Sequence, residues 1–275
     1  MNQYTDQTPV IISLSSHDPT GSSGIQADIE TAASLGCHCT PIITAVCAKD
    51  TQSLKDIVAT ETGFLIEQTR AILEDMPVRA IKIGMMATVE NVEAIHTILC
   101  DYPDIPVVLD PVIAEFSNEL FNTPGIIRAT QALLLPMTTI ATPDSVEAQQ
   151  FARQADTVDA CAHEILETGC DYVMVSGSVR TAESYGNTLY ANRRIVKHYD
   201  WPRLKMISHG AGATLSASVS AYLAHGFRIE EAVQQAQQFT WEALAASRRL
   251  GMGRQIPNRM HWANKSSKEQ KRNVS

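Results

Sequence analysis

A glycine-rich turn near the end of the chain leads directly into a helix of small residues. The turn reads His209-Gly210-Ala211-Gly212-Ala213, and the sequence continues as TLSASVSAYLAHG. Small residues let the backbone approach an anion closely, and the amide groups that begin a helix can hold one. Because the last position of the turn is Ala213, the segment predicts an anion-binding loop without a reactive side chain at its end.

Two common phosphate-binding motifs do not match this turn. A Walker A loop would place Lys and Ser or Thr after the glycines, and none follows at that spacing. A dinucleotide fingerprint would follow the first strand of the fold, whereas this turn follows the last one. A helix of small residues also occurs for close packing alone, and that alternative stays open.

A second candidate segment lies near the N-terminus. Residues 16–28 read SHDPTGSSGIQAD, a turn with two glycines followed by a helix whose first amides can hold a polar or anionic ligand. Asp28 comes early in that helix, where a capping carboxylate suits the helix dipole. It could equally accept hydrogen bonds from a hydroxyl or amine of a ligand, and both roles stay open.

Strand and helix patterns alternate along the chain and must position these two segments. Short apolar runs predict strands over residues 10–16, 40–48, 80–86, 106–113, 138–144 and 171–178. Amphipathic runs predict helices over residues 24–36, 62–76, 91–100, 123–136, 145–153 and 157–169. A hairpin over residues 186–200 precedes the glycine-rich turn, and two long helices follow it.

This alternation predicts an α/β fold with a mostly parallel sheet covered by helices on both faces. We expect one doubly wound domain over residues 1–264 and a disordered tail over residues 265–275. Ligands of such sheets bind at the carboxyl ends of the strands. The loops at those ends, including both glycine-containing segments, are therefore the candidate site.

Composition excludes several classes of function. The net charge of the 275 residues is -8, so the chain is a poor partner for nucleic acid. The N-terminus lacks a secretory signal and no stretch is long and apolar enough to span a membrane, so we expect a cytoplasmic protein. The six cysteines have no CxxC spacing, and we expect free thiols.

The order and spacing of the motifs resemble a known family. The segments DPTGSSGIQADI, TAVCAKDT, KIGMM, VVLDPVI, TPDSVEA and SHGAGATLSA are similar to those of the hydroxymethylpyrimidine/phosphomethylpyrimidine kinases. The resemblance covers nearly the whole chain and implies a ribokinase-like fold with three α/β/α layers. It also implies ATP-dependent phosphorylation of 4-amino-5-hydroxymethyl-2-methylpyrimidine and of its monophosphate in thiamine biosynthesis, with Mg²⁺, and a homodimer by family precedent.

The resemblance assigns roles by position. Gly210, Ala211, Gly212 and Ala213 would form the anion hole for the transferred phosphoryl group. The pyrimidine pocket would use Ser16, Asp28, Lys49, Met85 and Val112. ATP would lie along Thr142, Asp144 and Ser176, and water-mediated metal contacts would involve Asp110 and Glu147, although no direct metal ligand is assigned.

The chain departs from the family pattern close to the chemistry. The family usually has Cys at Ala213, Gln at Lys49, Asn at Asp50 and Asp144, and Lys at Ser176, and Glu115-Phe116-Ser117-Asn118 replaces its usual Ala-Lys-Ser-Gly. Two lysines are lost and acids are gained, so a site that must neutralise ATP becomes more negative. His209 or Asp28 could take the proton in place of the missing side chain.

Three hypotheses follow from these residues. The first is an active pyrimidine kinase that relies on backbone amides. The second is a catalytically weakened homologue that binds a pyrimidine, a pyridoxal-like molecule or a phosphate. The third is a kinase of a different small alcohol, with Lys49 and Asp50 reshaping the pocket.

Overall fold

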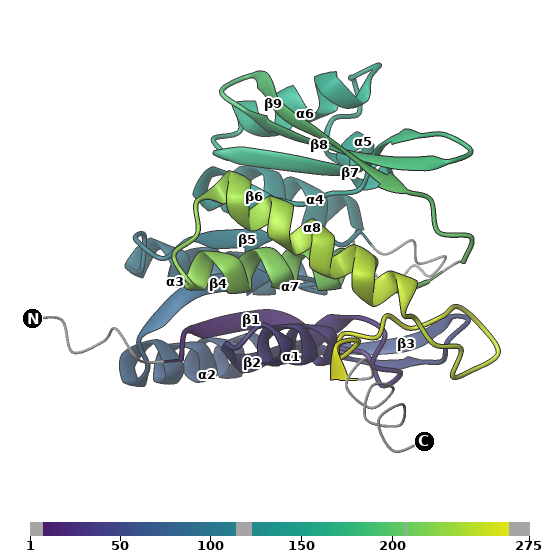
Figure 1. Cartoon of the computed structure of the whole chain (residues 1–275). Coiled ribbons are helices and arrows are strands. Elements are labelled where there is room, and N and C mark those ends of the chain that lie inside the picture. The colour runs from purple at the N-terminus through teal and green to yellow at the C-terminus, as the bar shows by residue number, and fades with distance from the viewer. Residues whose placement is uncertain (1–7, 114–122, 207, 264–275) are drawn as a thin grey trace, which may run out of the picture.

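The computed structural model describes residues 8–113, 123–206 and 208–263. These residues form one nine-stranded sheet with the strand order β3-β2-β1-β4-β5-β6-β7-β8-β9 (Figure 1). The strands are β1 (Val10–His17), β2 (His38–Lys49), β3 (Leu54–Ala59), β4 (Val78–Ile83), β5 (Val107–Leu109), β6 (Ile140–Ala141), β7 (Tyr172–Arg180), β8 (Ser184–Ala191) and β9 (Arg194–Pro202).

Eight α-helices of the described residues flank this sheet. They are α1 (Gly24–Ser34), α2 (Thr62–Asp75), α3 (Val89–Asp101), α4 (Thr123–Ala129), α5 (Ser145–Phe151), α6 (Val158–Glu167), α7 (Ala211–Ala224) and α8 (Ile229–Ala245). Helices α1, α7 and α8 pack together on one face, with α1 and α7 against the central strands (Figure 1). Helices α2 to α6 pack on the other face, so the predicted three-layer α/β fold is confirmed.

The six strands β2, β1, β4, β5, β6 and β7, which are neighbours in the sheet in that order, run parallel. Strand β1 combines four apolar residues with three serines and His17, and it is almost wholly buried because helices cover both of its faces. Side chains from β1, β4, β5 and helices α2, α3 and α6 form the larger core, and α7 and α8 enclose a smaller core on the opposite face. The parallel arrangement brings the carboxyl ends of these strands to one edge of the sheet.

The edges of the sheet differ in part from the sequence prediction. The hairpin is confirmed as β8 and β9, although both strands are longer than the pattern indicates. Strand β3 was missed; it pairs antiparallel with β2 as an edge strand. Its mixed sequence LKDIVA is mostly exposed or half-buried, so it carries no buried apolar run. The predicted helix over residues 123–136 continues from α4 through a π-helical turn, Thr130–Leu134, and a 3₁₀ turn, Leu135–Met137.

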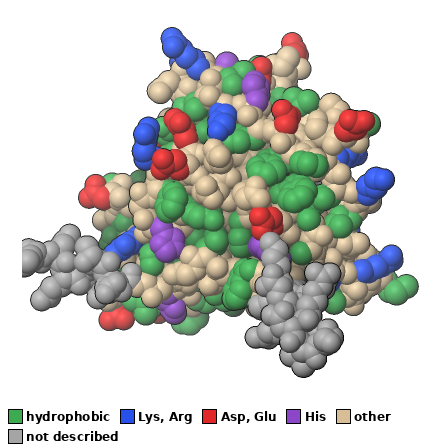
Figure 2. All heavy atoms as spheres, in the orientation of Figure 1, with side chains coloured by type: hydrophobic (Ala, Val, Ile, Leu, Met, Phe, Trp, Pro, Cys, Tyr) green, Lys and Arg blue, Asp and Glu red, His purple; other side chains and the backbone are tan. Residues whose placement is uncertain are grey.

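The surface in the orientation of Figure 1 carries charges of both signs, scattered among polar and apolar side chains (Figure 2). None of the helices that the structure describes is long and apolar enough to cross a bilayer. The six cysteines, all of them in described segments, are free thiols. The predicted tail, residues 265–275, lies outside the described residues, so the division into domain and tail stays a prediction.

Candidate active site

The glycine-rich turn forms the start of α7. Gly210 is the N-cap and adopts φ 99°, a left-handed conformation that favours glycine. A Cβ atom at this position would lie 1.6 Å from the backbone oxygen of Ser22, so the turn is pressed against the segment that precedes α1. The amides of Ala211, Gly212 and Ala213 have no partner one turn earlier in the helix, as expected at any helix start. They are available to an anion.

Helix α7 is buried along most of its length, which also confirms the close-packing role of its small residues. Its hydroxyls donate to carbonyl oxygens one turn earlier: those of Thr214 to Gly210 at 2.8 Å and of Ser218 to Thr214 at 2.7 Å. These bonds let hydroxyl side chains be buried within the helix. The two roles predicted for this segment are compatible, because the side chains along α7 pack against the core while the backbone amides of its first residues can hold an anion.

A cluster of three polar side chains, Asp18, Lys49 and His209, lies beside this helix start. The Lys49 Nζ atom lies 3.0 Å from Asp18 Oδ2 and 3.0 Å from His209 Nε2. The side chain of Lys49 is only 13% exposed, so it is not the surface lysine that a strand end would suggest. Ser23 Oγ is 3.2 Å from the same nitrogen of His209. The cluster joins the end of β2, the turn before α1 and the glycine-rich turn.

The charges of this cluster fix its protonation. Burial, followed by the positive charge of Lys49, lowers the pKa of His209 to about 4, so the imidazole is neutral at pH 7. Burial alone would raise the pKa of Asp18, but hydrogen bonds from Ser22, Lys49 and Thr20 outweigh it and the net shift is downward. Asp18 is thus a carboxylate, and Lys49 faces one anion and one neutral ring.

Asp18 organises the whole turn before α1. Its two carboxylate oxygens accept hydrogen bonds from the hydroxyls of Thr20, Ser22 and Ser23 at 2.7–2.8 Å. They also accept from the backbone amides of Thr20 and Ser23. The sequence placed Asp18 in a turn without giving it a role. The signal that could have found it is the run of hydroxyl residues two to five positions later.

Asp28 occupies a different place from the one the sequence indicates. It does not cap α1, because no side chain caps that helix and its first turn contains no acid. The carboxylate is fully buried and accepts from Lys82 Nζ at 3.0 Å and from Ser13 Oγ at 2.6 Å. A direct contact of Asp28 with substrate stays a prediction. The observed contacts place it beneath the site, where it neutralises the buried ammonium group of Lys82.

A second group of acids lies across α7 from Lys49. Asp110 directly follows β5 and accepts a hydrogen bond from Ser216 Oγ at 3.2 Å. A Cβ atom added to Gly212 would lie 3.6 Å from the carboxylate of Asp110, so this helix start is close to the acid. Burial raises the pKa of Asp110 to about 6, with Lys82 opposing the shift and Asp28 adding to it. Burial, followed by the charge of Asp110, raises the pKa of Glu147 to about 8. The two carboxyls destabilise each other's ionised form.

Asp144 caps the N-terminus of α5, a role for which aspartate is well suited. Its Oδ1 atom accepts from the amides of Val146 and Glu147, both at 2.8 Å, and Glu147 accepts from the amide of Asp144 at 2.9 Å. This reciprocal capping box begins α5. Asn and Asp are about equally good N-caps, so the replacement of Asn by Asp at this position preserves the structure.

The remaining predicted residues lie along the same edge of the sheet. Ser16, Lys49, Met85 and Val112 follow or end β1, β2, β4 and β5, which are neighbours in the sheet. Thr142 and Asp144 follow β6, and Ser176 is in β7, where it pairs with Asp144 through an isolated bridge. The structure thus brings the predicted pyrimidine and nucleotide residues to one edge of the sheet, where the start of α7 adjoins Lys49 through His209 and Asp110 through Gly212. Residues 115–118 lie outside the described residues.

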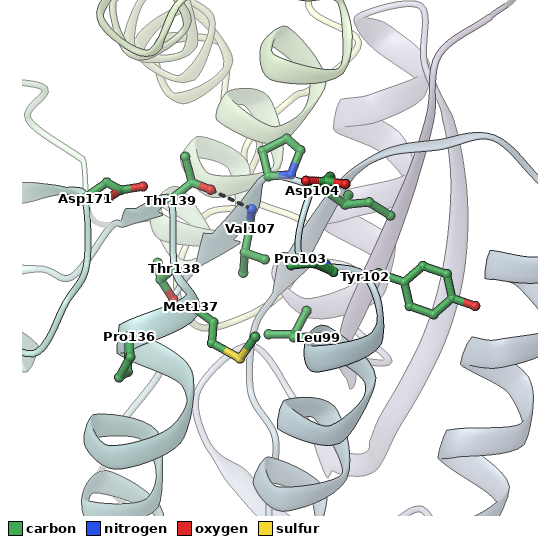
Figure 3. Close-up of a pocket in the computed structure, with 12 residues that line it drawn as sticks. Leu99, Tyr102, Pro103, Asp104, Val107, Pro136, Met137, Thr138, Thr139 and Asp171 are labelled. Atoms are coloured by element: carbon green, nitrogen blue, oxygen red, sulfur yellow. Dashed lines mark hydrogen bonds between the residues drawn. The ribbon is translucent and has the colours of Figure 1, made fainter.

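One surface hollow lies away from these loops. It has a volume of about 390 Å³ and lies at the amino ends of β5 and β6, opposite the edge that carries the loops (Figure 3). Its walls include the end of α3 and the 3₁₀ turn, and Asp104 and Asp171 are the charged residues among those that line it. No group of charged side chains converges there, so it is not a candidate for the chemistry.

Sequence reasoning missed one residue that contacts both glycine-containing segments. Arg259 is fully buried near the C-terminus, and its guanidinium group donates to carbonyl oxygens of the turn before α1 and to Thr214 in α7. No local pattern marks Arg259, because its partners are far away in the sequence. It can be recognised only from the packing.

Comparison with known proteins agrees with this geometry. Residues 18–258 match the sequence model of the phosphomethylpyrimidine kinase family, which covers most of the chain. The chain belongs to this family. A hydroxymethylpyrimidine/phosphomethylpyrimidine kinase of Mycobacterium bovis is 31% identical over 252 residues, which cover 89% of this chain and 91% of the relative. The predicted family membership is therefore confirmed.

Solved structures of related kinases have the same fold. A pyridoxal kinase of Bacillus subtilis in complex with ADP has a TM-score of 0.85 and 26% identity, and covers 94% of this chain and 99% of its own. A phosphomethylpyrimidine kinase of Clostridium difficile has a TM-score of 0.73 and 27% identity, and covers 86% and 100%. The family and its structural neighbours are thus ribokinase-like vitamin kinases, as the motifs indicate.

Proposed function

We propose that this protein transfers a phosphoryl group from ATP to 4-amino-5-hydroxymethyl-2-methylpyrimidine and then to its monophosphate, in thiamine biosynthesis. One observation carries the proposal beyond family membership. The amides that begin α7 adjoin Lys49 through His209, and Gly212 of the same helix start lies near the carboxylate of Asp110. An anion passing from one half of the site to the other would meet these amides.

The amides are the main source of stabilisation in this proposal. Phosphoryl transfer passes through a loose transition state, in which positioning and charge stabilisation count for more than deprotonation of the attacking hydroxyl. A general base typically contributes ~10²–10⁴-fold, so its loss at Ala213 slows the reaction without abolishing it. Backbone amides at a helix start provide fixed dipoles that need no reorganisation.

Two groups could accept the proton of the attacking hydroxyl. His209 adjoins Gly210 and is neutral at pH 7, but its Nε2 atom accepts from Lys49 Nζ at 3.0 Å, so Lys49 must turn away before this nitrogen can take a proton. Asp28 is fully buried, and its Oδ2 atom accepts from Lys82 and Ser13, whereas its Oδ1 atom has no partner in the described residues. In this proposal the backbone amides supply most of the stabilisation, and the proton acceptor supplies less.

The residues present fit ATP and Mg²⁺. Mg²⁺ is usually held by one or two carboxylates together with substrate phosphates and water. Asp110 and Glu147 supply two carboxyls, and within the described residues no third acid, histidine or cysteine joins them into a protein-only cage. Their mutual repulsion would be relieved by a cation. When bound, the metal would supply charge neutralisation for the phosphates, and Thr142, Asp144 and Ser176 would adjoin the nucleotide.

A pyridoxal-type alcohol is the second candidate substrate. The B. subtilis pyridoxal kinase matches this chain with the higher of the two TM-scores above. Lys49 offers only donors, where the family usually has a glutamine that also accepts. A ring that presents an acceptor oxygen or nitrogen to Lys49 would suit the cluster, whereas an amino group would not. A cytoplasmic location and a homodimer also remain proposals.

The test is direct phosphorylation by the purified protein. It is incubated with ATP, Mg²⁺ and either the pyrimidine alcohol or pyridoxal, and products are measured by mass spectrometry. We expect the pyrimidine monophosphate followed by the pyrophosphate. Pyridoxal phosphate as the faster product would favour the second candidate. Absence of any phosphorylated product at high enzyme concentration, with binding of the pyrimidine measured by calorimetry, would favour a binding protein instead.

A further inference from the structure

Arg259 is the largest fully buried side chain in the described residues. Its guanidinium group donates four hydrogen bonds: Nε to Thr214 Oγ1 at 2.9 Å, Nη1 to the Gly21 carbonyl at 3.0 Å and to Glu30 Oε2 at 3.1 Å, and Nη2 to the Ser22 carbonyl at 2.6 Å. Its side chain is 0% exposed. Such burial of a charge is costly unless every donor has a defined partner.

The partners belong to the two segments that build the site. Gly21 and Ser22 are in the turn that Asp18 organises, and Thr214 is in the first turn of α7. Because Arg259 Nε can only donate, the Thr214 oxygen accepts from it, and the Thr214 hydroxyl hydrogen is left to donate to the Gly210 carbonyl at 2.8 Å. One guanidinium group therefore fixes the direction of a chain of hydrogen bonds that ends at Gly210.

The same group supports the tight contact between the segments. The hypothetical Cβ of Gly210 would meet the Ser22 carbonyl and, at 2.9 Å, Arg259 Nη2. The Ser22 carbonyl oxygen thus contacts Gly210 and also accepts a hydrogen bond from the guanidinium group. Arg259 is itself anchored, since its backbone oxygen accepts from Ser34 Oγ of α1 at 2.8 Å.

We propose that Arg259 is a positioning residue that locks the turn before α1 onto the start of α7, and so aims the amides of residues 211–213 at the transferred phosphoryl group. It acts through Gly21, Ser22 and Thr214, without touching substrate. Only a fork of several donors in one plane can reach all three together. A lysine keeps the charge and loses this geometry. The catalytic part of this proposal rests on the proposed kinase function.

The test compares Arg259→Lys with the matched control Arg249→Lys. Arg249 lies ten residues earlier in the same C-terminal region, is exposed and, among the residues that the structure describes, donates to the Met252 carbonyl alone. Hydrogen exchange is measured on both proteins without substrate. We expect the hydrogen-bonded amides of residues 20–23 and of Thr214 to exchange at least about tenfold faster in Arg259→Lys, and to be unchanged in the control.

Steady-state kinetics then separate positioning from folding. We expect kcat of Arg259→Lys, corrected for the folded fraction, to fall about tenfold or more, because misaimed amides weaken transition-state stabilisation. KM for the alcohol substrate should change much less, since Lys49 and its partners are intact. In Arg259→Ala, millimolar guanidinium chloride should restore part of kcat by occupying the vacated space, and should have no such effect on the control.

The outcomes distinguish two failures. If the wild-type protein phosphorylates no substrate, the kinase function is wrong, and hydrogen exchange alone decides whether Arg259 couples the two segments. If the wild type is active but exchange and corrected kcat of Arg259→Lys match those of the control, the positioning role is overturned and the kinase function stands. If Arg259→Lys fails to fold, guanidinium rescue of Arg259→Ala decides, and lack of rescue counts against the proposal.

Discussion

Replacement of Gly210 by alanine tests the packing at the centre of the site. Gly210 has φ 99°, and an added Cβ would lie 1.6 Å from the Ser22 oxygen and 2.7 Å from its carbonyl carbon. Both atoms are backbone, so no side chain can rotate away to make room. The methyl group can be accepted only if the turn before α1 and the start of α7 move apart.

The magnitude has two parts. A left-handed conformation costs a non-glycine residue about 1–2 kcal/mol. Forcing an extra methyl group into a packed interior typically costs a further ~1–3 kcal/mol. Gly210→Ala should therefore lower the free energy of unfolding by about 2–5 kcal/mol, which corresponds to a fall in Tm of very roughly 4–20 °C for a domain of this size.

Two other glycines provide matched controls. Gly226, at the end of α7, has φ 87° with open space around its hypothetical Cβ, so Gly226→Ala should cost only the conformational part, about 1–2 kcal/mol. Gly212 lies within α7, and its Cβ would make only an ordinary contact, 3.6 Å from Asp110. Gly212→Ala should be neutral, or stabilising by up to about 1 kcal/mol because alanine favours helix.

Urea unfolding and kinase activity are measured for all three variants. We expect the stability order Gly212→Ala, then Gly226→Ala, then Gly210→Ala. Gly210→Ala should also lose activity per folded molecule, because the amides of α7 are displaced, whereas Gly226→Ala should retain it. Equal losses of stability in Gly210→Ala and Gly226→Ala would refute the packing argument, and full activity in a folded Gly210→Ala would refute the role of the loop.

Three further predictions concern the side chains around this loop. Ala213→Cys should raise kcat severalfold, up to the range of a general base, by restoring the side chain usual in the family; unchanged kcat with normal folding would show that this position does not limit the rate. His209 binds its proton less tightly in the folded state (pKa about 4) than in the unfolded state, so wild-type stability should fall as pH drops from 7 towards 4. Between pH 7 and pH 4, the free energy of unfolding of a His209→Gln variant should fall by up to about 3 kcal/mol less than that of the wild type, as measured by urea unfolding at each pH. If the two proteins lose the same free energy of unfolding over this range, the lowered pKa of His209 is contradicted. Binding of Mg²⁺ with nucleotide at pH 7 should release protons from Glu147, whose pKa is raised to about 8 by burial and by Asp110, and calorimetry in buffers of different ionisation enthalpy should show this release weakened in Glu147→Gln.

The parallel core of the fold was predictable because its signals are local. The strands β1, β2, β4 and β7 are short segments rich in apolar residues and bounded by turns, and helices between them follow the 3.6-residue period. Strand β3 escaped this reasoning, since an edge strand with exposed faces needs only backbone pairing with β2. Pairing between strands is not a property of either sequence alone.

The backbone of the candidate site was predictable, and its side-chain contacts were less so. Glycines at 210 and 212 followed by small residues mark a helix start with free amides, and this is a local property of the chain. The partners of Asp28 were not predictable, because Lys82 and Ser13 come from two other strands. The pairing of Lys49 with Asp18 and His209 likewise joins three separate loops.

The sequence by itself determined the alternation of the parallel strands with helices, the glycine-rich start of α7 and the lack of a reactive side chain at Ala213. These follow from residue type and spacing over a few positions. Only the tertiary structure decided which charges are buried together and that Arg259 connects two segments more than 180 residues apart in the sequence. The physical reason is that burial and charge pairing depend on distances in space, which the packing of the sheet and α7 sets after local structure has formed.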